Sequence, residues 1–277
     1  PAPLRPTITC SPPGRIVLRD VSFAFVEGSR PVLEHVDLEI GAGGLHVIVG
    51  RNGAGKSTLV KLIAGLYAPT RGTVSIGEYD LSQFAREELA RWINYLSQQA
   101  YLFGGELIDT LRRAAPGQSD DQILAACRLS GAHEFISRMP HGYRSEIGEG
   151  GNGLSVGERR KIALALSYLR RPSVLILDEP SNDLDFQSER TLLATLVAAA
   201  KVRTIVVVTH SLRIVSAASR VYHVTGEGNV EQGPAAEMVP RLFGVKQAVA
   251  AVPAPPAPEA PAVPESGSPA VAEPSLA

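Results

Sequence analysis

Alternating apolar and polar residues near the start of the chain predict two half-buried β-strands, at residues 15–25 and 36–40. Nearly continuous apolar runs follow at residues 45–49, 174–177 and 204–208. Such runs are typical of strands that are buried on both faces of a parallel sheet. The chain therefore contains candidates for both half-buried and fully buried strands.

Apolar residues at helical spacing accompany the buried strands. After the first run and a glycine-rich turn, the spacing is carried by Leu59, Leu62, Ile63 and Leu66. Helical stretches also precede the other two runs, at residues 158–169 and 189–200. Strand, loop and helix in this order open an α/β unit, so we predict an α/β fold.

Between residues 89 and 168 the pattern is mainly helical. Helical periodicity is clearest at residues 123–129 and 133–139, and there is little strand signal. This stretch predicts a separate helical lobe.

Composition changes sharply towards the end of the chain. From residue 247 onward the sequence is mostly Ala, Pro, Val, Ser and Glu, without Lys or Arg. A segment of this kind cannot bury an apolar stripe, so we expect residues 247–277 to form a disordered tail.

Charge and cysteine content exclude several classes of protein. The formal net charge is −1, from 27 Lys and Arg against 28 Asp and Glu, so no global field favours nucleic acid or an anionic membrane. No apolar run reaches the roughly 18 residues of a membrane-spanning helix. Cys10 and Cys127 lie far apart without a CxxC pattern, so neither a disulfide framework nor a cysteine metal site is indicated, and a reducing compartment fits.

A phosphate-binding loop is predicted between the first buried strand and its helix. The pattern G-x-x-x-x-G-K-[ST] is formed by Gly50, Arg51, Asn52, Gly53, Ala54, Gly55, Lys56, Ser57 and Thr58. Its backbone N–H groups and the helix N-terminus can hold a polyphosphate, Lys56 can reach the outer phosphates, and the Ser57 hydroxyl can bind Mg²⁺. The alternative is a glycine-rich turn that only caps a helix. We expect the chain to bind a nucleoside triphosphate.

Two carboxylates end the buried run at residues 174–177. Asp178 can hold Mg²⁺ through water, and Glu179 can polarise an attacking water. An acidic pair at a strand end can also be a solvated turn. Together with the phosphate loop, the pair favours nucleotide hydrolysis.

The surrounding motifs decide which phosphate-loop family fits. Gln98 follows an apolar step at residues 93–96, the sequence LSVGE occupies residues 154–158, and His210 ends the run at residues 204–208. The series resembles the nucleotide-binding domain of ABC transporters, with an A-loop aromatic, Walker A, Q-loop, signature, Walker B, D-loop and switch histidine in that order. The resemblance covers about residues 15–233. It implies a P-loop NTPase (RecA-like) core with an antiparallel β subdomain and a helical signature subdomain at about residues 95–170.

The resemblance implies roles for four further residues. Phe25 would stack on adenine where exporters usually have Tyr, although it could instead be a core aromatic. Gln98, or Gln99 in the alternative register, would contact Mg²⁺ and the attacking water. Asp185 in the D-loop-like segment could bind across to a second protomer or only cap a helix. His210 would contact the γ-phosphate, or serve only as a polar cap.

The signature segment has two compatible interpretations. Ser155 and Glu158 have the spacing of a capping box, which would open the following helix. In the family, Ser155, Gly157 and Glu158 would also face the γ-phosphate that the opposite subunit binds. Val156 and Glu158 replace the usual glycine and glutamine. We hypothesise that the β-branched Val156 loosens the closed dimer.

Two segments resemble exporters in particular. Residues 143–151 look like the X-loop, which contacts the intracellular loops of a transmembrane domain, and residues 101–110 resemble the exporter pattern after the Q-loop. The alternative for residues 143–151 is a flexible glycine loop. The sequence GEGG at residues 148–151 is similar to exporters of the type I secretion and bacteriocin group. Residues 1–14 would then be a linker from a preceding transmembrane domain, and residues 15–246 the nucleotide-binding domain.

The resemblance implies the ATP-hydrolysing motor of an ABC exporter, with ATP and Mg²⁺ as cofactors. Its expected partners are a transmembrane domain, on the same or a separate chain, and a second nucleotide-binding domain in a homodimer or heterodimer, with no nucleic acid. The expected location is the cytoplasmic face of the inner cell membrane. The alternatives are a soluble ABC ATPase without a transport role and a degenerate regulatory subunit that binds ATP.

Overall fold

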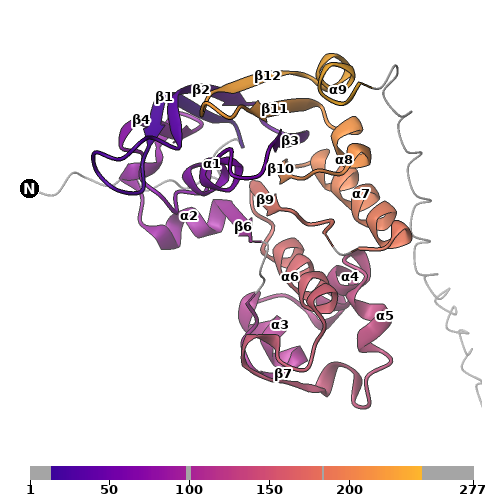
Figure 1. Cartoon of the computed structure of the whole chain (residues 1–277). Helices are drawn as coiled ribbons and strands as arrows, with labels where there is room; N and C mark the ends of the chain where they lie inside the picture. Colours follow the sequence, from indigo (N-terminus) through magenta and orange to yellow (C-terminus); the bar gives the residue numbers. More distant parts are fainter. Residues whose placement is uncertain (1–13, 98–100, 183, 245–277) are drawn as a thin grey trace, which may run out of the picture.

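The computed structural model describes residues 14–97, 101–182 and 184–244. These residues form two lobes (Figure 1). Both larger sheets belong to one lobe, and a group of helices forms the other. The predicted linker up to residue 13, the predicted tail from residue 247, and Gln98 and Gln99 lie outside the described residues.

A mainly parallel sheet of six strands forms the centre of the larger lobe, in the order β12-β11-β3-β10-β9-β6. Its strands are β3 (Leu45–Gly50), β6 (Ile93–Leu96), β9 (Val174–Asp178), β10 (Thr204–Val208), β11 (Arg220–Val224) and β12 (Val230–Pro234). Only β12 pairs in the antiparallel direction. Val208 at the end of β10 pairs with Ile48 on one side and with Asp178 on the other. The carboxyl ends of β3, β9 and β10 therefore meet at one edge of the sheet, where ligands bind in open α/β sheets.

Both faces of this sheet are buried, which explains the continuous apolar runs. Alternate residues such as Ile48, Ile176 and Val206 belong to one hydrophobic core, and Val47 and Leu177 belong to another. Helix α1 (Lys56–Ile63) packs into the first core. The second is covered by α7 (Phe186–Ala200), α8 (Leu212–Ser216) and α9 (Ala235–Phe243).

An antiparallel sheet lies beside the first core, in the order β2-β1-β4-β5. It consists of β1 (Ile16–Phe23), β2 (Leu33–Ile40), β4 (Arg71–Ile76) and β5 (Tyr79–Asp80). Helix α2 (Arg86–Trp92) and a short 3-10 turn, η1 (Leu81–Gln83), connect this sheet to β6. The predicted half-buried strands are both present, with β1 ending at Phe23 rather than at residue 25.

The smaller lobe has a hydrophobic core of its own. Its helices are α3 (Leu107–Ala114), α4 (Asp120–Leu129), α5 (Ala132–Ile136) and α6 (Val156–Arg170). Two-residue strands β7 (Gly105–Glu106) and β8 (Glu146–Ile147), and the turns η2 (Gly142–Arg144) and η3 (Glu149–Gly151), complete it. One departure from the sequence pattern is β6, which extends the parallel sheet into the stretch where little strand was predicted.

Candidate nucleotide site

The turn between β3 and α1 requires glycine at two positions. Gly50 has a φ of 152°, and a Cβ there would lie 2.5 Å from the carbonyl oxygen of Val224. Gly55 has a φ of 102° and forms the N-cap of α1 without a side chain. The first N–H groups of a helix have no partner within the helix, and α1 has no acidic residue in its first turn. The loop therefore leads into the positive N-terminus of a helix, which suits a phosphate group.

Lys56 is the buried cation of this loop. Its ammonium donates hydrogen bonds to the carbonyl oxygens of Gly50 at 2.9 Å and Arg51 at 3.1 Å. Burial lowers the pKa of Lys56, while the carboxylates of Glu179 and Asp178 act in the opposite direction. The two carboxylates predicted from the end of β9 therefore do lie close to the phosphate loop.

Asp178 is buried where β9 ends. The hydroxyl of Tyr95 on β6 donates a hydrogen bond to its Oδ2 at 3.1 Å. Burial, followed by the negative charge of Asp178, raises the pKa of Tyr95, so the phenol stays protonated and able to donate. Tyr95 was not predicted from the sequence, because the residue pattern of β6 does not indicate that this strand pairs beside β9.

Glu179 occupies an unusual backbone conformation. Its φ is 51°, in the left-handed region that a non-glycine residue rarely adopts, and its backbone N–H donates to Val208 on β10 at 2.8 Å. Its Oε1 lies 3.2 Å from Nε2 of His210. Its Oε2 is buried and has no hydrogen-bond partner among the described residues. Burial raises the pKa of Glu179, and the positive charges of His210 and Lys56 partly offset this. A buried carboxylate with a free oxygen and a raised pKa is suited to accept a proton.

Hard oxygen donors are available for a divalent cation. Among the described residues no cluster of three or more His, Cys, Asp and Glu could hold a metal by itself. Mg²⁺ in nucleotide sites needs only one or two protein oxygens, because phosphate oxygens and water supply the rest. The carboxylate of Asp178 and the hydroxyl of Ser57, the second residue of α1, fit this requirement.

An exposed aromatic group lies beyond the end of β1. The ring of Phe25 is 63% exposed, and it meets Phe23 and Tyr67 in edge-to-face contacts at 5.1 and 5.9 Å. Phe25 is thus not a core residue, unlike Phe23, the last residue of β1. Tyr67, which stacks on Phe23, was not predicted as part of this group.

The predicted capping box of the signature segment is confirmed. The Ser155 hydroxyl accepts a hydrogen bond from the N–H of Glu158 at 3.2 Å, and the Glu158 carboxylate accepts one from the N–H of Ser155 at 2.8 Å. Val156 is half exposed. A Cβ at Gly157 would meet no atom within 4 Å. This segment opens α6 in the smaller lobe, whereas α1 lies in the larger one (Figure 1).

Asp185 is the N-cap of α7, with its carboxylate accepting the N–H of Ser188 at 2.8 Å. The capping interpretation of Asp185 is therefore confirmed. Its neighbour Asp183 lies outside the described residues, as does Gln98. The chain thus brings Lys56, Asp178, Glu179 and His210 together around the phosphate loop.

Comparison with known proteins identifies the family. A sequence model described as "ABC transporter" matches residues 33–182, more than half of the chain. The chain belongs to the ABC transporter family. A model described as an AAA domain matches the shorter stretch of residues 152–216. The ABC transporter match contains the phosphate loop, the signature segment and both carboxylates that end β9.

Several ABC transporter proteins are similar over most of this chain. The alpha-hemolysin translocation ATP-binding protein HlyB of Escherichia coli is 36% identical over 226 residues, which cover 82% of this chain and 32% of that protein. The cyclolysin secretion/processing ATP-binding protein CyaB of Bordetella pertussis is 37% identical over 220 residues, or 79% of this chain and 31% of that protein. This chain thus spans about a third of the length of these relatives.

A solved structure has the same fold. The structure of a bacterial Atm1-family ABC exporter with ATP bound matches with a TM-score of 0.80 and 29% identity, over 87% of this chain and 42% of that one. The predicted α/β P-loop fold and the predicted resemblance to ABC transporter nucleotide-binding domains are confirmed. Within the part of the chain that is described, no helix combines the length and the hydropathy of a membrane span.

Proposed function

We propose that this chain is the ATP-hydrolysing motor domain of an ABC exporter, which dimerises around two ATP molecules to drive translocation through a transmembrane domain. The observation that carries the proposal is the convergence of Lys56, Asp178, Glu179 and His210 on one phosphate-binding loop. Translocation and secretion in the names of HlyB and CyaB, and the solved structure of an ABC exporter, support the type of transport. The domain would work at the cytoplasmic face of the inner cell membrane.

Each residue has a distinct task in this proposal. The ring of Phe25 stacks on adenine, and the loop from Gly50 to Thr58 binds the phosphates, with Lys56 on the outer ones. Ser57, Asp178 and Gln98 would hold Mg²⁺. Mg²⁺, when bound, neutralises negative charge on the phosphate oxygens. Glu179 accepts a proton from the attacking water, and His210 orients Glu179 and contacts the γ-phosphate.

A second nucleotide-binding domain would complete the site. Gly157 has an ordinary φ and open space around it, so none of the described residues requires a glycine there. The helix N-terminus at Ser155 is exposed to solvent and is stabilised by its capping box. Both features fit a surface that another molecule approaches closely, with the γ-phosphate bound by the second domain lying near Ser155, Gly157 and Glu158. Asp185, the N-cap of α7, would face the second domain in this arrangement.

An exposed aromatic pair supports docking of a transmembrane domain. The rings of Tyr101 and Phe103 are 62% and 65% exposed and meet edge to face at 5.8 Å. Glu149, in the predicted X-loop, accepts hydrogen bonds from the Tyr101 hydroxyl at 2.5 Å and from the N–H of Gly104 at 3.0 Å. The two segments that resemble exporters thus form one surface. A transmembrane partner could cover its apolar rings.

The proposal is tested by steady-state hydrolysis of Mg-ATP at increasing protein concentration, with the mass in solution followed by light scattering. The wild-type rate should rise faster than linearly with concentration. Glu179→Gln should lose about 100-fold or more of its turnover, yet accumulate as an ATP-bound dimer. Tight ATP binding with no turnover at any concentration would contradict a self-sufficient motor and favour the regulatory alternative.

A further inference from the structure

His210 has little contact of its own to fix its position. Its side chain is 53% exposed, and among the described residues its ring makes a polar contact with Glu179, at 3.2 Å. An exposed side chain with one polar contact is placed mainly by its backbone. The residues on either side of His210 therefore decide whether its ring meets Glu179.

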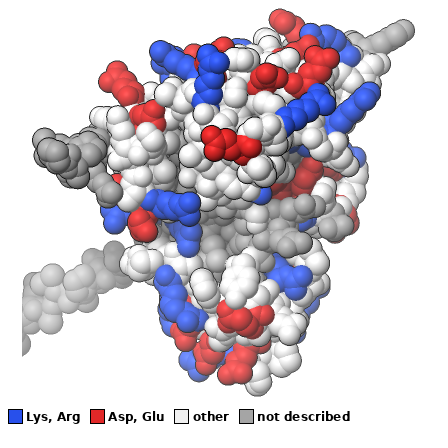
Figure 2. All heavy atoms as spheres, turned by 60° about the vertical axis from the view of Figure 1, so that its left-hand side comes forward, with Lys and Arg blue, Asp and Glu red and all other residues white. Residues whose placement is uncertain are grey.

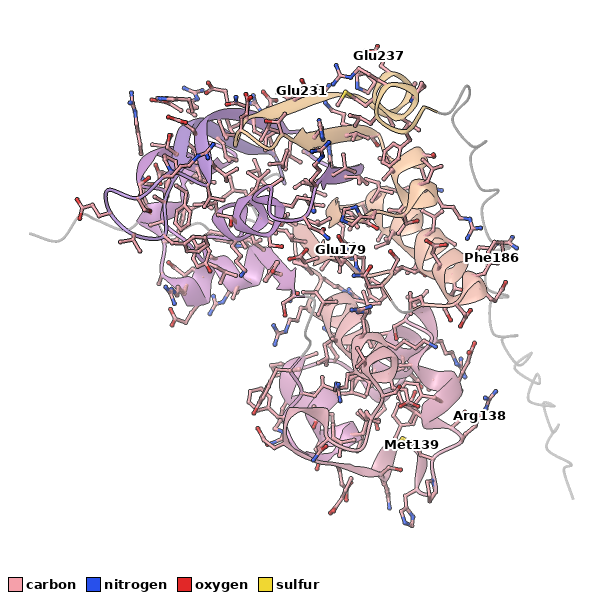
Figure 3. The ribbon with its side chains drawn as sticks, viewed as in Figure 1. Arg138, Met139, Glu179, Phe186, Glu231 and Glu237 are labelled. Carbon is pink, nitrogen blue, oxygen red and sulfur yellow. The ribbon has the colours of Figure 1, made fainter. Side chains whose placement is uncertain are left out.

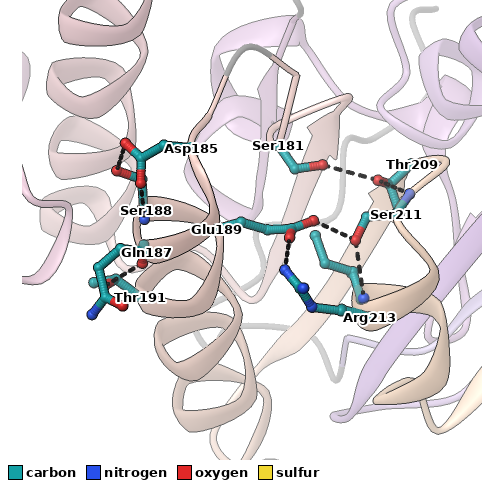
Figure 4. Close-up of polar contacts among 10 residues, drawn as sticks. Ser181, Asp185, Gln187, Ser188, Glu189, Thr191, Thr209, Ser211 and Arg213 are labelled. Atoms are coloured by element: carbon teal, nitrogen blue, oxygen red, sulfur yellow. Dashed lines mark hydrogen bonds and ion pairs between the residues drawn. The ribbon is translucent and has the colours of Figure 1, made fainter. Parts of the chain in front are cut away.

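Both of these neighbours are held by side-chain hydrogen bonds (Figure 4). The hydroxyls of Thr209 and Ser181 lie 3.1 Å apart, which links the His210 segment to the chain that leaves β9. The N–H of Ser211 donates to the Thr209 hydroxyl at 3.0 Å. The Ser211 hydroxyl donates to Oε1 of Glu189 at 2.5 Å.

Glu189 on α7 is the centre of this arrangement. Its side chain is only 18% exposed, and its second oxygen, Oε2, accepts a hydrogen bond from Arg213 at 2.6 Å. The Arg213 guanidinium in turn lies 3.9 Å above the ring of Phe186, the first residue of α7. Both carboxylate oxygens of Glu189 are thus used to hold the segment that follows His210.

The same contacts reach the segment between β9 and α7. Ser181 lies at its start and Asp185 at its end, where Asp185 caps α7 one turn before Glu189. In the proposed function this segment faces the second nucleotide-binding domain. A displacement of α7 by that partner would therefore act directly on Ser211.

We propose that Glu189 is a positioning residue, which holds the backbone at Ser211 so that His210 meets Glu179, and which links this contact to the dimer-facing segment before α7. The inference rests on the proposed function. It goes further, because it assigns a role in turnover to a residue of α7 that does not contact the nucleotide loop. The alternative is that Glu189 binds Ser211 and Arg213 only to stabilise the packing of α7 against α8. In that case, replacing Glu189 would lower the stability of the fold without changing kcat.

The test compares variants of the full 277-residue chain in Mg-ATP hydrolysis. Glu189→Ala should lower kcat about tenfold while KM for ATP changes less than about twofold, because only the geometry at His210 is disturbed. Glu189→Gln should recover kcat to within about threefold of wild type, since its amide oxygen still accepts the Ser211 hydroxyl. Arg213→Met, which keeps the apolar stem over Phe186, should lower kcat less than Glu189→Ala, and the double variant should be no slower than Glu189→Ala.

The matched control is Glu237→Ala. Glu237 is an exposed glutamate on α9 for which the described residues show no hydrogen bond or ion pair, and Figure 3 shows it far from Glu179. This variant should keep the wild-type kcat and KM. Thermal unfolding of each variant, followed by circular dichroism, verifies that the protein is folded at the assay temperature.

A spectroscopic readout separates positioning from stability. The imidazole resonance of His210, identified by its absence in His210→Gln, should shift or broaden in Glu189→Ala and stay unchanged in Glu237→Ala. An unchanged His210 resonance, or a wild-type kcat in folded Glu189→Ala, would overturn the inference. If Glu189→Ala does not fold, Arg213→Met and Glu189→Gln decide by the same readouts. Absence of hydrolysis in the wild type would contradict the proposed function instead, and the His210 resonance would still test the role of Glu189.

Discussion

On the phosphate-loop side of the site, Lys56, Asp178 and Glu179 are buried, and one carboxylate oxygen has no partner among the described residues. On the signature side, Ser155 and Glu158 bond to each other and Val156 is exposed to solvent. Burying charged groups is costly unless a ligand or an opposite charge compensates them, whereas a capping box stabilises a helix by about 1 kcal/mol with no ligand. The buried charges and the unpartnered oxygen of the first side are therefore suited to binding a ligand, whereas the second side is stabilised by its own hydrogen bonds.

The difference indicates what each side contributes. The phosphate-loop side should determine whether ATP binds to this chain at all. The signature side should leave that binding unchanged and affect only the closed dimer. Acidic and basic residues are interspersed on the face of the molecule shown in Figure 2. Substitutions on either side test whether ATP binding and dimer closure are divided in this way.

Lys56→Met is expected to have the largest effect. It removes the ammonium group that is hydrogen-bonded to the carbonyl oxygens of the phosphate loop, so turnover should fall at least about 100-fold. At 100 times Kd, bound Mg-ATP stabilises the folded protein by about 2.7 kcal/mol and so raises its Tm. This rise in Tm should disappear in Lys56→Met. Thermal unfolding with and without Mg-ATP measures it. Lys201→Met, at an exposed lysine after α7, is the control and should behave as wild type. A nucleotide-dependent rise in Tm that persists in Lys56→Met would show that the phosphate-loop side does not determine ATP binding.

His210→Ala should have the next largest effect, with a loss of about 10- to 100-fold in kcat. Glu179 acts as a base only when it is deprotonated, and burial raises its pKa while His210 lowers it. Without His210 the pKa of Glu179 rises further, so the fall of kcat on the acid side should move to higher pH. Rate measurements from pH 5 to 9 test this shift. The exposed His141 provides the control, since His141→Ala should keep both the rate and the profile. An unchanged acid limb in His210→Ala would show that the two residues are not coupled.

Much of this site could be predicted from sequence because its parts are local in the chain. The phosphate loop has fixed spacing between a strand and a helix, and the capping box needs only Ser155 and Glu158 three residues apart. The contacts of Tyr95 and Glu189 were missed for the opposite reason. Tyr95 reaches Asp178 only because β6 pairs beside β9, and Glu189 reaches Ser211 only because α7 packs beside α8. Such contacts depend on tertiary arrangement, for which single residues carry no signal.

Helix boundaries illustrate the same distinction. The sequence pattern predicted helices at residues 158–169 and 189–200, and both begin earlier, at Val156 and Phe186. The apolar periodicity starts only where a helix meets the core. The true starts are set by the capping residues Ser155 and Asp185, which lie outside the periodic pattern.

Tyr95→Phe should have an intermediate effect on the phosphate-loop side. It leaves the carboxylate of Asp178 buried without the hydroxyl donor, and hydrogen bonds to charged groups contribute about 1.5–3 kcal/mol. We expect the nucleotide-free protein to lose about this much unfolding free energy and kcat to fall severalfold. Urea unfolding, with Tyr79→Phe as the control on β5, measures the first effect. Equal stability of the two variants would show that Asp178 finds another donor.

Val156→Gly should have the smallest effect and should act only on the signature side. Val156 is half exposed at the first position of α6, and glycine there removes a β-branched side chain from the surface that a second domain would approach. The affinity for ATP should stay the same, because the phosphate loop is intact, while kcat rises about two- to threefold as the closed dimer tightens. The loss of helix propensity should cost less than about 1 kcal/mol. Val202→Gly, at a valine that is 79% exposed after α7, controls for the added flexibility. If Val156→Gly gave no rise in kcat, the valine would not limit closure of the dimer. The exposed signature side would then differ from the phosphate-loop side in burial and hydrogen bonding, but Val156 would not limit the rate of turnover.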